Sequence, residues 1–362
     1  MFVNRNSRVN NRKECLITDY QTLNDIQKTI FKRIESHYQE ILTGHQVKPL
    51  RLIVMGTAGT GKTYLIKAIR SRLKEMKEAG SKSSIIVLAL TGVAAFNIDG
   101  ITVHLGLSIP IINDSKRMDI KGEQLKQLQN RLKDVRYVVI DEKSMVGRRM
   151  LALIDMRLRQ AFPENNNEPF GGRSIILFGD FGQIPPVLDL PMYANTKRDE
   201  LSNSGLIAYK HFREVYKLET IQRQSGDSIE QQEFRNILLR LRNGESTIDD
   251  WRKLTTRTED KLSIVERNRF HDALFILTKW AEVNLVNIDR LRSLSVPVAK
   301  IQAIHSGGSE AKKADSDTAY GLEAYILLAR GARVMLTVNL QTQSSLVNSS
   351  MGTIQDIIFQ ED

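Results

Sequence analysis

The stretch Gly56-Thr-Ala-Gly-Thr-Gly61-Lys62-Thr63 decides the fold. It satisfies the pattern G-x-x-x-x-G-K-[ST], in which glycines let successive backbone N–H groups face the phosphates of a nucleotide. The apolar run Arg51–Met55 before it predicts a buried strand, and Lys62–Met76 after it predicts a helix with one apolar face. The dipole of that helix would favour a phosphate at its start. We therefore predict a phosphate-binding loop; an accidental glycine-rich turn is the alternative.

Two side chains of this loop carry specific chemistry. Lys62 can reach the β- and γ-phosphates as a point charge, and the Thr63 hydroxyl can bind Mg²⁺. The expected cofactors are therefore ATP and Mg²⁺. The loop residues expected to bind the nucleotide are Gly56, Thr57, Ala58, Gly59, Thr60, Gly61, Lys62 and Thr63.

Three more apolar runs indicate an open α/β sheet. Ile85–Leu90, Tyr137–Ile140 and Ser174–Phe178 end at Thr, Asp and Gly, respectively. Their Ile, Val and Leu content suits a parallel sheet that is covered on both faces. The order strand, helix, strand is that of a βαβ unit, so we predict the α/β class.

Acidic and amide side chains follow two of these runs. Because the carboxyl ends of parallel strands meet at one crevice, we expect Asp141 to hold Mg²⁺ and Glu142 to orient or deprotonate the attacking water. Gln183 ends the string Gly179-Asp-Phe-Gly-Gln183, and its neutral amide can contact both the γ-phosphate and a water. We predict a sensor role for it. An ordinary solvated strand end is the alternative for Asp141-Glu142, and a turn with a polar residue is the alternative for the string that ends at Gln183.

The whole chain restricts the class of protein further. Its 362 residues suggest about two domains, and its net charge of +10 favours polyanionic partners, although a generally basic soluble protein fits as well. The single cysteine, Cys15, excludes an internal disulfide and a cysteine-based zinc site. The six histidines lack ligand spacing, and no apolar run approaches the roughly 20 residues that span a bilayer. We predict neither a transition-metal site nor a membrane segment.

The expected organisation is a flexible tail over residues 1–20, a first lobe over 21–190 and a second over 205–362. The proline-containing stretch Ile184–Asn203 is interpreted as their link. In the second lobe we expect a helix with Phe234, Ile237, Leu238 and Leu241 inward, two strands and a surface insertion. Their ranges are Ile229–Arg242 for the helix, Ala273–Leu277 and Arg333–Val338 for the strands, and His305–Ala319 for the insertion.

The order of the motifs resembles the Pif (petite integration frequency) family of superfamily-one DNA helicases, from about Leu23 to the C-terminus. Phe170-Gly171-Gly172, leading to Gly179–Val187, is the most family-specific string. The other strings that carry the resemblance are Leu23–Gln27, Leu90–Ala95, Gly100–His104, Ile140–Met145, Gln222–Gln224, Phe234, Arg242–Gly244, Arg330–Asn339, Asn348 and Gly352.

This resemblance implies further residue roles. Gln27 would read the adenine edge, and Arg223 would reach the γ-phosphate across the interdomain cleft. A guanidinium from the other lobe would stabilise transition-state charge and link hydrolysis to closure. Single-stranded DNA would contact Thr91, Gly92, Thr102 and His104. Phe96 is a stacking candidate for which core packing is the preferred interpretation.

The resemblance also implies two RecA-like lobes and an ATP-dependent DNA helicase. It would travel 5′ to 3′ on single-stranded DNA and unwind duplexes in repair, recombination or telomere maintenance. The implied partners are single-stranded DNA and duplex junctions, bound by a monomer, and the implied location is the nucleus or, alternatively, the mitochondrion. Two other hypotheses remain open: a nucleotide-dependent DNA-binding remnant that no longer unwinds, and a P-loop NTPase acting on RNA or protein.

The sequence departs from the family pattern at three places. Lys143 stands where many members have an apolar or aromatic residue, and Asn348-Ser349-Ser350 stands where Asn-Gly is commoner. The sequence ends at Asp362, before the family's fifth and sixth motifs. We therefore expect a truncated copy whose second lobe is incomplete.

Overall fold

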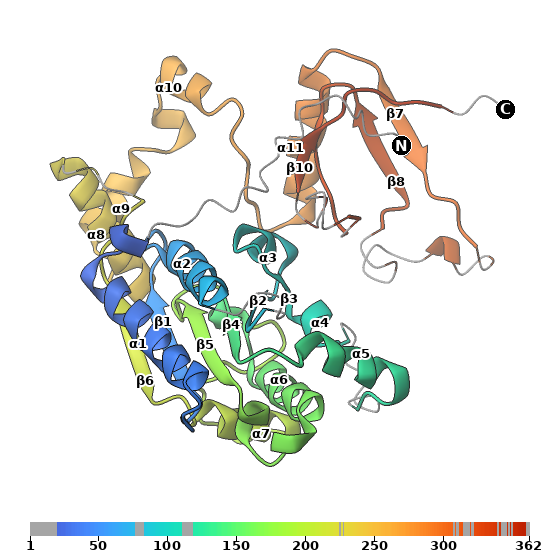
Figure 1. Cartoon of the computed structure of the whole chain (residues 1–362). Coiled ribbons are helices and arrows are strands. Elements are labelled where there is room, and N and C mark those ends of the chain that lie inside the picture. The colour runs from blue at the N-terminus through green and yellow to red at the C-terminus, as the bar shows by residue number, and fades with distance from the viewer. Residues whose placement is uncertain are drawn as a thin grey trace. The chain divides into compact units, whose positions relative to one another are not determined.

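A computed structural model describes residues 20–76, 83–110, 119–223, 226, 228–306, 308, 311–313, 319, 322–338, 340–341, 346, 348 and 350–359. The chain divides into two compact units between Thr247 and Ile248 (Figure 1). The predicted tail over residues 1–20 lies almost entirely outside the described residues, as do most of His305–Ala319 and Gln224. Among the described residues, no helix is both long and apolar enough to cross a membrane.

A six-stranded sheet, with every neighbouring pair parallel, forms the centre of the first unit. Its strand order is β3-β2-β4-β5-β1-β6. The strands are β1 (Arg51–Gly56), β2 (Ile85–Ala89), β3 (Ile101–Thr102), β4 (Tyr137–Ile140), β5 (Ser174–Gly179) and β6 (Glu214–Leu218). Every residue of β4 and β5 is buried, as a sheet covered on both faces requires. The four predicted strands and the α/β class are confirmed.

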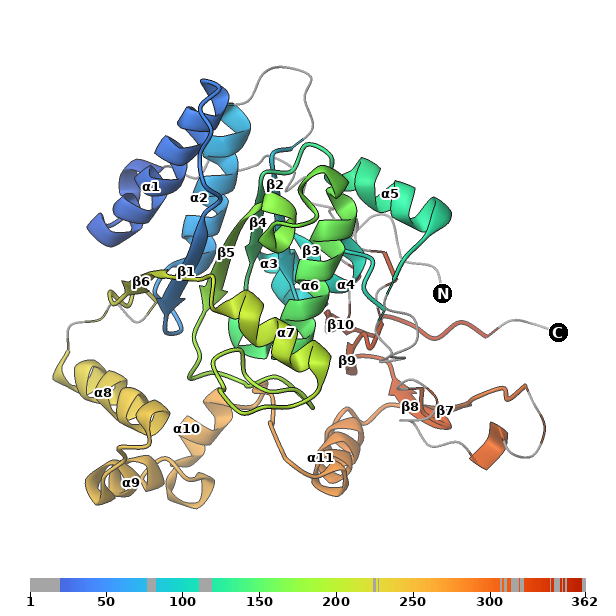
Figure 2. The same cartoon turned by 90° about the horizontal axis from the view of Figure 1, so that it is seen from below.

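Helices cover both faces of this sheet, α1 and α2 on one side and α6 and α7 on the other (Figure 2). The helices of the unit are α1 (Asp25–Leu42), α2 (Lys62–Glu75), α3 (Gly92–Asn97), α4 (Val103–Gly106), α5 (Gly122–Leu132), α6 (Arg148–Ala161), α7 (Glu200–Tyr209) and α8 (Ile229–Asn243). Short 3-10 helices are η1 (Tyr20–Thr22), η2 (Lys143–Met145), η3 (Pro163–Asn165) and η4 (Pro169–Gly172). The helices predicted over Lys62–Met76 and Ile229–Arg242 are confirmed as α2 and α8.

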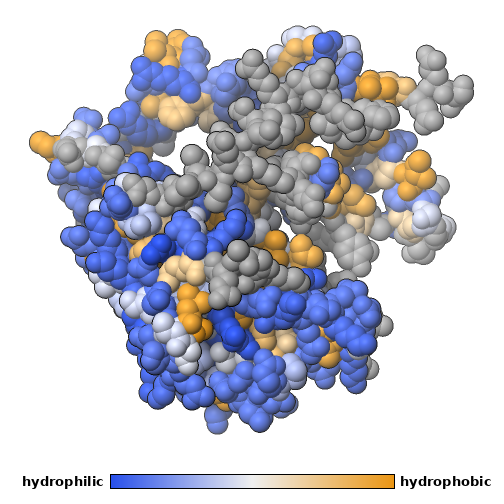
Figure 3. Space-filling model, in the orientation of Figure 1, coloured by the Kyte–Doolittle hydropathy of each residue, from blue (hydrophilic) through white to orange (hydrophobic). Residues whose placement is uncertain are grey.

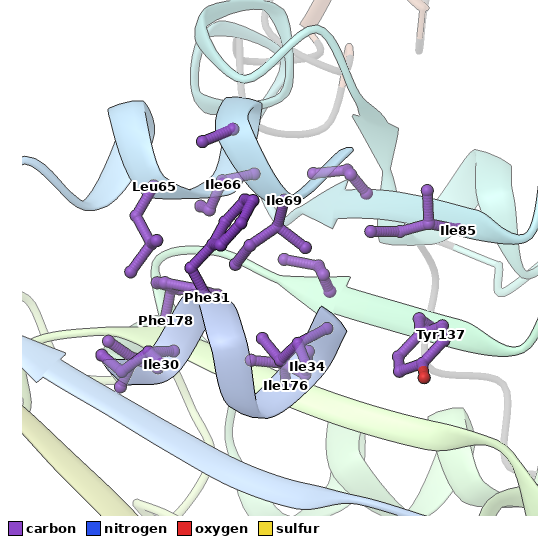
Figure 4. Packing of buried hydrophobic residues seen from close by; sticks show 14 of the residues in the cluster. Ile30, Phe31, Ile34, Leu65, Ile66, Ile69, Ile85, Tyr137, Ile176 and Phe178 are labelled. Atoms are coloured by element: carbon purple, nitrogen blue, oxygen red, sulfur yellow. The ribbon is translucent and has the colours of Figure 1, made fainter. Parts of the chain in front are cut away.

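The core between α1, α2 and the sheet follows from helical spacing. Ile30 and Ile34 of α1, and Leu65 and Ile69 of α2, are fully buried because residues three or four apart share one helix face. Figure 4 shows them directed toward Ile176 and its neighbours on the strands. Each such side chain contributes roughly 1.5–3 kcal/mol of burial free energy. This packing fixes the start of α2, and with it the phosphate loop, against the sheet.

A second core covers the opposite face. It holds Leu128 and Leu132 of α5 and Leu151, Ile154 and Leu158 of α6 against strand residues that include Val138 and Ile140. In α8, by contrast, only Ile237 of the four residues predicted to face inward is buried; Phe234 is 46%, Leu238 37% and Leu241 56% exposed. The helical period is right, but the prediction of a buried face is wrong for three of its four members.

The predicted boundary between the lobes is wrong. The stretch assigned to a link folds back on the first unit, since the buried guanidinium of Arg148 donates to the carbonyl oxygens of Thr196 (2.6 Å) and Ser202 (2.9 Å). Strand β6, placed in the second lobe from sequence, forms a parallel ladder with β1. The edge strand gains backbone hydrogen bonds there, which composition does not reveal. The first unit therefore extends to Thr247.

The described part of the second unit consists of helices and two antiparallel strand pairs, β7 with β8 and β9 with β10. Its elements are α9 (Ile248–Thr255), η5 (Glu259–Lys261), α10 (Ile264–Arg269), α11 (Trp280–Ser293), β7 (Val298–Gln302), η6 (Ala311–Lys313), β8 (Tyr325–Ala329), β9 (Arg333–Met335) and β10 (Met351–Thr353). The strand predicted over Arg333–Val338 is confirmed in its first half. The strand predicted over Ala273–Leu277 is wrong: this run lies outside any strand, and Ile276 is 96% exposed.

Candidate nucleotide site

The phosphate loop joins the end of β1 to the start of α2. Gly59 and Gly61 have φ angles of 84° and 81°, in the left-handed region that favours glycine. Lys62 Nζ donates to the carbonyl oxygens of Gly56 (2.8 Å) and Thr57 (3.0 Å), so the ammonium lies across the mouth of the loop. Burial lowers the pKa of Lys62, against the opposing effect of nearby carboxylates. The loop has the form that the sequence predicts.

Three predicted motifs meet at one edge of the sheet. Strands β1, β5 and β4 are neighbours and run parallel, with Met55 paired to Gly179 and Ile140 paired to Leu177. The phosphate loop follows β1, the string Gly179–Gln183 follows β5, and Asp141-Glu142 follows β4. The topology thus brings the nucleotide, sensor and acidic motifs to the same edge.

Asp141 and Glu142 form a turn directly after β4. Asp141 is 5% exposed; burial raises its pKa to about 6, while the hydrogen bond that its Oδ1 accepts from the Glu142 N–H (2.9 Å) opposes the rise. Glu142 has φ 53° and ψ 46°, a left-handed backbone that is uncommon for a residue with a side chain. The carboxylate of Asp141 and the hydroxyl of Thr63 are oxygen donors of the kind that Mg²⁺ prefers, so these residues fit the ion.

The loop after β5 carries Gln183, which is half-buried. Its backbone N–H donates to the Asp180 carbonyl oxygen (3.0 Å), closing a turn. The Asp180 carboxylate accepts hydrogen bonds from both Nε (2.8 Å) and Nη2 of Arg242 on α8. Burial alone would raise the pKa of Asp180, but the bonds from Arg242 and from the Gly182 N–H lower it. The loop is therefore held by an ion pair that the sequence did not indicate.

Lys143 is a second feature that the sequence reading missed as a site residue. It is fully buried, its Nζ donates to the Gly179 carbonyl oxygen (2.5 Å), and it lies 4.2 Å from the centroid of the Phe181 ring. Burial lowers its pKa to about 8. The available signal was a lysine inside a motif where an apolar residue is usual.

Gln27 contacts the phosphate loop directly. Its side chain is buried: Nε2 donates to the Thr60 carbonyl oxygen (3.2 Å), and Oε1 accepts from the Asn24 N–H (3.1 Å) in the capping box that begins α1. A Cβ atom at Gly61 would lie 2.5 Å from Nε2. Gln27 thus lies beside the predicted nucleotide site, and its contact with adenine stays a prediction.

Arg223 does not belong to the second unit. It follows β6 in the first unit, and its backbone N–H donates to the Gly59 carbonyl oxygen (3.2 Å), as does that of Gln222 (2.7 Å). The prediction that it reaches in from another lobe is therefore wrong, because the β6–β1 ladder returns the chain to the phosphate loop. Its charge is close enough to oppose protonation of Lys62.

The residues predicted to contact DNA gather beside β2 and β3. Ala89 of β2 is paired with Thr102, which places Thr91 and Thr102 at neighbouring strand ends. Their hydroxyls cap short helices by accepting from the Ala94 N–H (3.2 Å) and the Leu105 N–H (3.3 Å). Gly92 begins α3 and half-buried His104 lies on α4, where burial lowers its pKa. Phe96 is 47% exposed, so the preferred interpretation of it as a core residue is wrong.

Comparison with protein families gives a match over most of the first unit and beyond. The model described as PIF1-like helicase matches residues 22–252. The chain belongs to the PIF1-like helicase family. The predicted resemblance is thereby confirmed.

Curated members of the PIF1-like helicase family align with most of this chain. The ATP-dependent DNA helicase PIF1 of Candida albicans is 28% identical in an alignment of 340 residues that covers 91% of this chain and 35% of that protein. The ATP-dependent DNA helicase RRM3 of Saccharomyces cerevisiae is 28% identical over 87% of this chain and 42% of its own length. The chain thus spans about a third to two fifths of the length of these curated relatives.

Solved PIF1-like helicases share the fold. The crystal structure of Pif1 helicase from Candida albicans has a TM-score of 0.66 and 26% identity, covering 92% of this chain and 69% of that one. The structure of Pif1 helicase from Bacteroides in complex with ADP-AlF3 and single-stranded DNA has a TM-score of 0.59 and 26% identity, covering 89% and 70%. The predicted P-loop NTPase fold is confirmed.

Proposed function

We propose that this chain is the ATP-hydrolysing motor of a DNA helicase. The observation that carries the proposal is the meeting of the phosphate loop, Asp141-Glu142 and the Gln183 loop at the carboxyl edge of β1, β4 and β5. A nucleotide phosphate, a metal-binding carboxylate and a water-directing group are the parts that phosphoryl transfer to water requires. The names of the relatives, which are ATP-dependent DNA helicases, support the same activity.

In this proposal each residue has one task. The loop N–H groups and Lys62 bind the β- and γ-phosphates, and Glu142 accepts a proton from the attacking water or orients it. Thr63 and Asp141 would hold Mg²⁺, which supplies positive charge for the phosphate oxygens. Gln183 contacts the γ-phosphate and the water. Arg223 stabilises transition-state charge from its place beside Gly59.

Single-stranded DNA is the polymer along which we propose that the motor moves. The strand-end residues beside β2 and β3 would contact the backbone of single-stranded DNA, and the net charge of +10 favours such a partner. Hydrolysis would release a closed state and move the motor along one strand, 5′ to 3′ by family resemblance, toward duplex junctions. We propose a monomer as the functional unit; light scattering with and without a forked duplex tests this.

The decisive experiment measures ATP hydrolysis by the 362-residue protein with Mg²⁺ and single-stranded DNA. Lys62→Ala should reduce turnover at least about a hundredfold, because phosphoryl-transfer catalysis is almost entirely positioning and electrostatic stabilisation. Lys67→Ala is the matched control: Lys67 lies on the same helix but its ammonium pairs with Asp99 (3.2 Å), so its turnover should equal that of the wild type. Unchanged turnover in Lys62→Ala would refute the site.

A separate experiment tests which polymer the motor moves along. Stimulation of hydrolysis by single-stranded DNA, and not by RNA, supports the helicase proposal, as does unwinding of a forked duplex. Stimulation by RNA alone, or by neither polymer, supports an NTPase with another partner. DNA binding that depends on nucleotide, without unwinding, supports a remnant that binds but no longer separates strands.

A further inference from the structure

A buried lysine connects two of the motifs at the nucleotide site. Lys143 follows Asp141-Glu142 directly, and its Nζ donates to the carbonyl oxygen of Gly179, the last residue of β5 (2.5 Å). Its ammonium also lies over the Phe181 ring, 4.2 Å from the centroid. A buried ammonium loses its hydration and needs such compensation, so this side chain is held in one place.

The backbones of the two motifs are in equally close contact. Gly179 has φ 137°, and a Cβ atom there would lie 2.8 Å from the backbone nitrogen of Lys143. No side chain fits between them. Both the backbone and the ammonium of Lys143 therefore set the distance between the Asp141-Glu142 turn and the end of β5.

A second cation holds the same loop from α8. Arg242 binds both carboxylate oxygens of Asp180, whose Oδ1 also accepts from the Gly182 N–H (3.0 Å). A Cβ atom at Gly182 would lie 2.6 Å from Arg242 Nε. The Gln183 N–H donates to the Asp180 carbonyl oxygen (3.0 Å), so the position of Gln183 depends on this turn.

We infer that Lys143 is a positioning residue that holds the Gly179–Gln183 loop against the Asp141-Glu142 turn, so that Gln183 and Glu142 act on the same phosphate and water. The inference rests on the proposed ATP hydrolysis and adds a residue to it. Loss of Lys143 should lower the rate of hydrolysis strongly, because a misplacement of about 1 Å in a catalytic group costs on the order of a hundredfold in rate. In this role Lys143 acts through the Gly179 carbonyl oxygen and the Phe181 ring, which its ammonium contacts.

The test compares Lys143→Met with the wild type in the full 362-residue protein. Methionine retains an unbranched stem against Phe181 but loses the donor and the charge. The kcat for MgATP hydrolysis should fall about tenfold to a hundredfold while the KM changes less than about twofold, because alignment in the transition state is lost and ground-state binding is retained. Phe181→Leu, which removes the ring and keeps the lysine, should lower kcat in the same direction by less.

A matched control separates positioning from stability. Arg173, at the opposite end of β5, is also a buried cation over an aromatic ring, 3.8 Å from the centroid of Phe162. Arg173→Met should lower the melting temperature and leave kcat as in the wild type. An equal loss of kcat in both variants would mean that lost stability, and not position, explains the effect.

A double-mutant cycle with Gln183→Ala tests the route of the effect. If Lys143 acts by placing Gln183, then Lys143→Met should lower kcat less than about threefold in the Gln183→Ala background. The same fold-loss in both backgrounds would overturn the inference. A role in stability alone would lower kcat by the same factor with and without Gln183, so the double-mutant cycle distinguishes positioning from stability.

The inference and the proposed function fail in different ways. A wild type that hydrolyses ATP together with a Lys143→Met variant of equal kcat overturns only the inference. A wild type without hydrolysis overturns the proposed function. The inference is then tested by nucleotide binding: Lys143→Met must weaken the binding of ADP–aluminium fluoride and leave the binding of ADP unchanged. Equal binding of that analogue by both proteins, or no binding by either, overturns the inference.

Discussion

At the scale of one residue, the backbone of Glu142 is strained. Its left-handed backbone (φ 53°, ψ 46°) costs about 1–3 kcal/mol for a non-glycine residue. The hydrogen bond from its N–H to the Asp141 carboxylate (2.9 Å) maintains this conformation. The turn leaves Asp141 buried and Glu142 half-buried, which agrees with separate roles for the two carboxylates.

Glu142→Gln should therefore bind nucleotide and fail to turn it over. Glutamine preserves size and the backbone turn but cannot accept the proton, which removes about 10²–10⁴-fold of rate. Equilibrium titration with a fluorescent ATP analogue and a steady-state hydrolysis assay check the two halves. Loss of nucleotide binding would show that Glu142 is structural and does not act on the water.

His37 is a second residue whose chemistry is set by burial. Its Nε2 donates to the Lys48 carbonyl oxygen (3.0 Å), so in the neutral ring its Nδ1 accepts from the Tyr137 hydroxyl (2.6 Å). Burial lowers the pKa of His37 below its usual 6.5. The stability that it contributes is complete above pH 6.5 and is lost as pH falls from there toward the lower folded-state pKa.

The stability that His37 contributes should therefore be smaller at about pH 5.5 than at about pH 7.5, falling by at most about 1.4 kcal/mol per pH unit. Urea titrations of the wild type and His37→Gln measure this. The variant is expected to be less stable at both pH values and to show the shallower decrease. Parallel curves for the two proteins would contradict the assignment.

At the scale of elements, the turn in η4 shows why a family-specific string has its composition. Phe170 and Gly171 have φ of 58° and Gly172 has φ of 69°, three successive left-handed residues. The Asp155 carboxylate on α6 accepts from the Phe170 N–H (2.5 Å), and a Cβ atom at Gly171 would lie 2.5 Å from the Leu158 carbonyl oxygen. The backbone of this turn packs against α6, and strand β5 follows it.

Gly171→Ala should consequently destabilise the protein by more than about 3 kcal/mol, because left-handed strain of 1–2 kcal/mol adds to a backbone clash. Gly122→Ala is the matched control: its φ is 59°, and nothing lies within 4 Å of the added Cβ. The control should lose only about 1–2 kcal/mol. Thermal and urea unfolding compare them, and equal losses would exclude the clash with α6.

At the scale of the whole molecule, the two units differ in how much they bury. The first unit has two apolar cores, one on each face of its sheet. Among the described residues of the second, the buried apolar side chains are Ala329 and Ala332 alone, while Trp251 is 65% and Trp280 77% exposed. Figure 3 shows apolar surface over α10 of this unit. Small buried area provides little stabilisation.

We expect the second unit to unfold first. Limited trypsin digestion should cut within residues 248–359 before it cuts the first unit, leaving a fragment that ends near Thr247. Because opening of a weakly packed segment needs little free energy, these cuts should occur at temperatures well below the main thermal transition. Cleavage of both units at the same rate would contradict the difference in packing.

The sequence by itself determined the phosphate loop, the strands β1, β2, β4 and β5, and the acidic and glutamine motifs after them. These features depend on local rules: glycines where φ is positive, apolar runs in buried strands, and polar residues at parallel strand ends. Family membership followed from the same strings. Such patterns need no knowledge of distant contacts.

Only the tertiary structure decided where the first unit ends and what surrounds its motifs. The β6–β1 ladder brought Arg223 to Gly59, and the ion pair of Asp180 with Arg242 joins residues 62 positions apart. Lys143 became a site residue through its contact with Gly179 across 36 positions. Contacts between residues this far apart in sequence require the chain to close long loops. The entropic cost of closing those loops is not visible in any local sequence pattern.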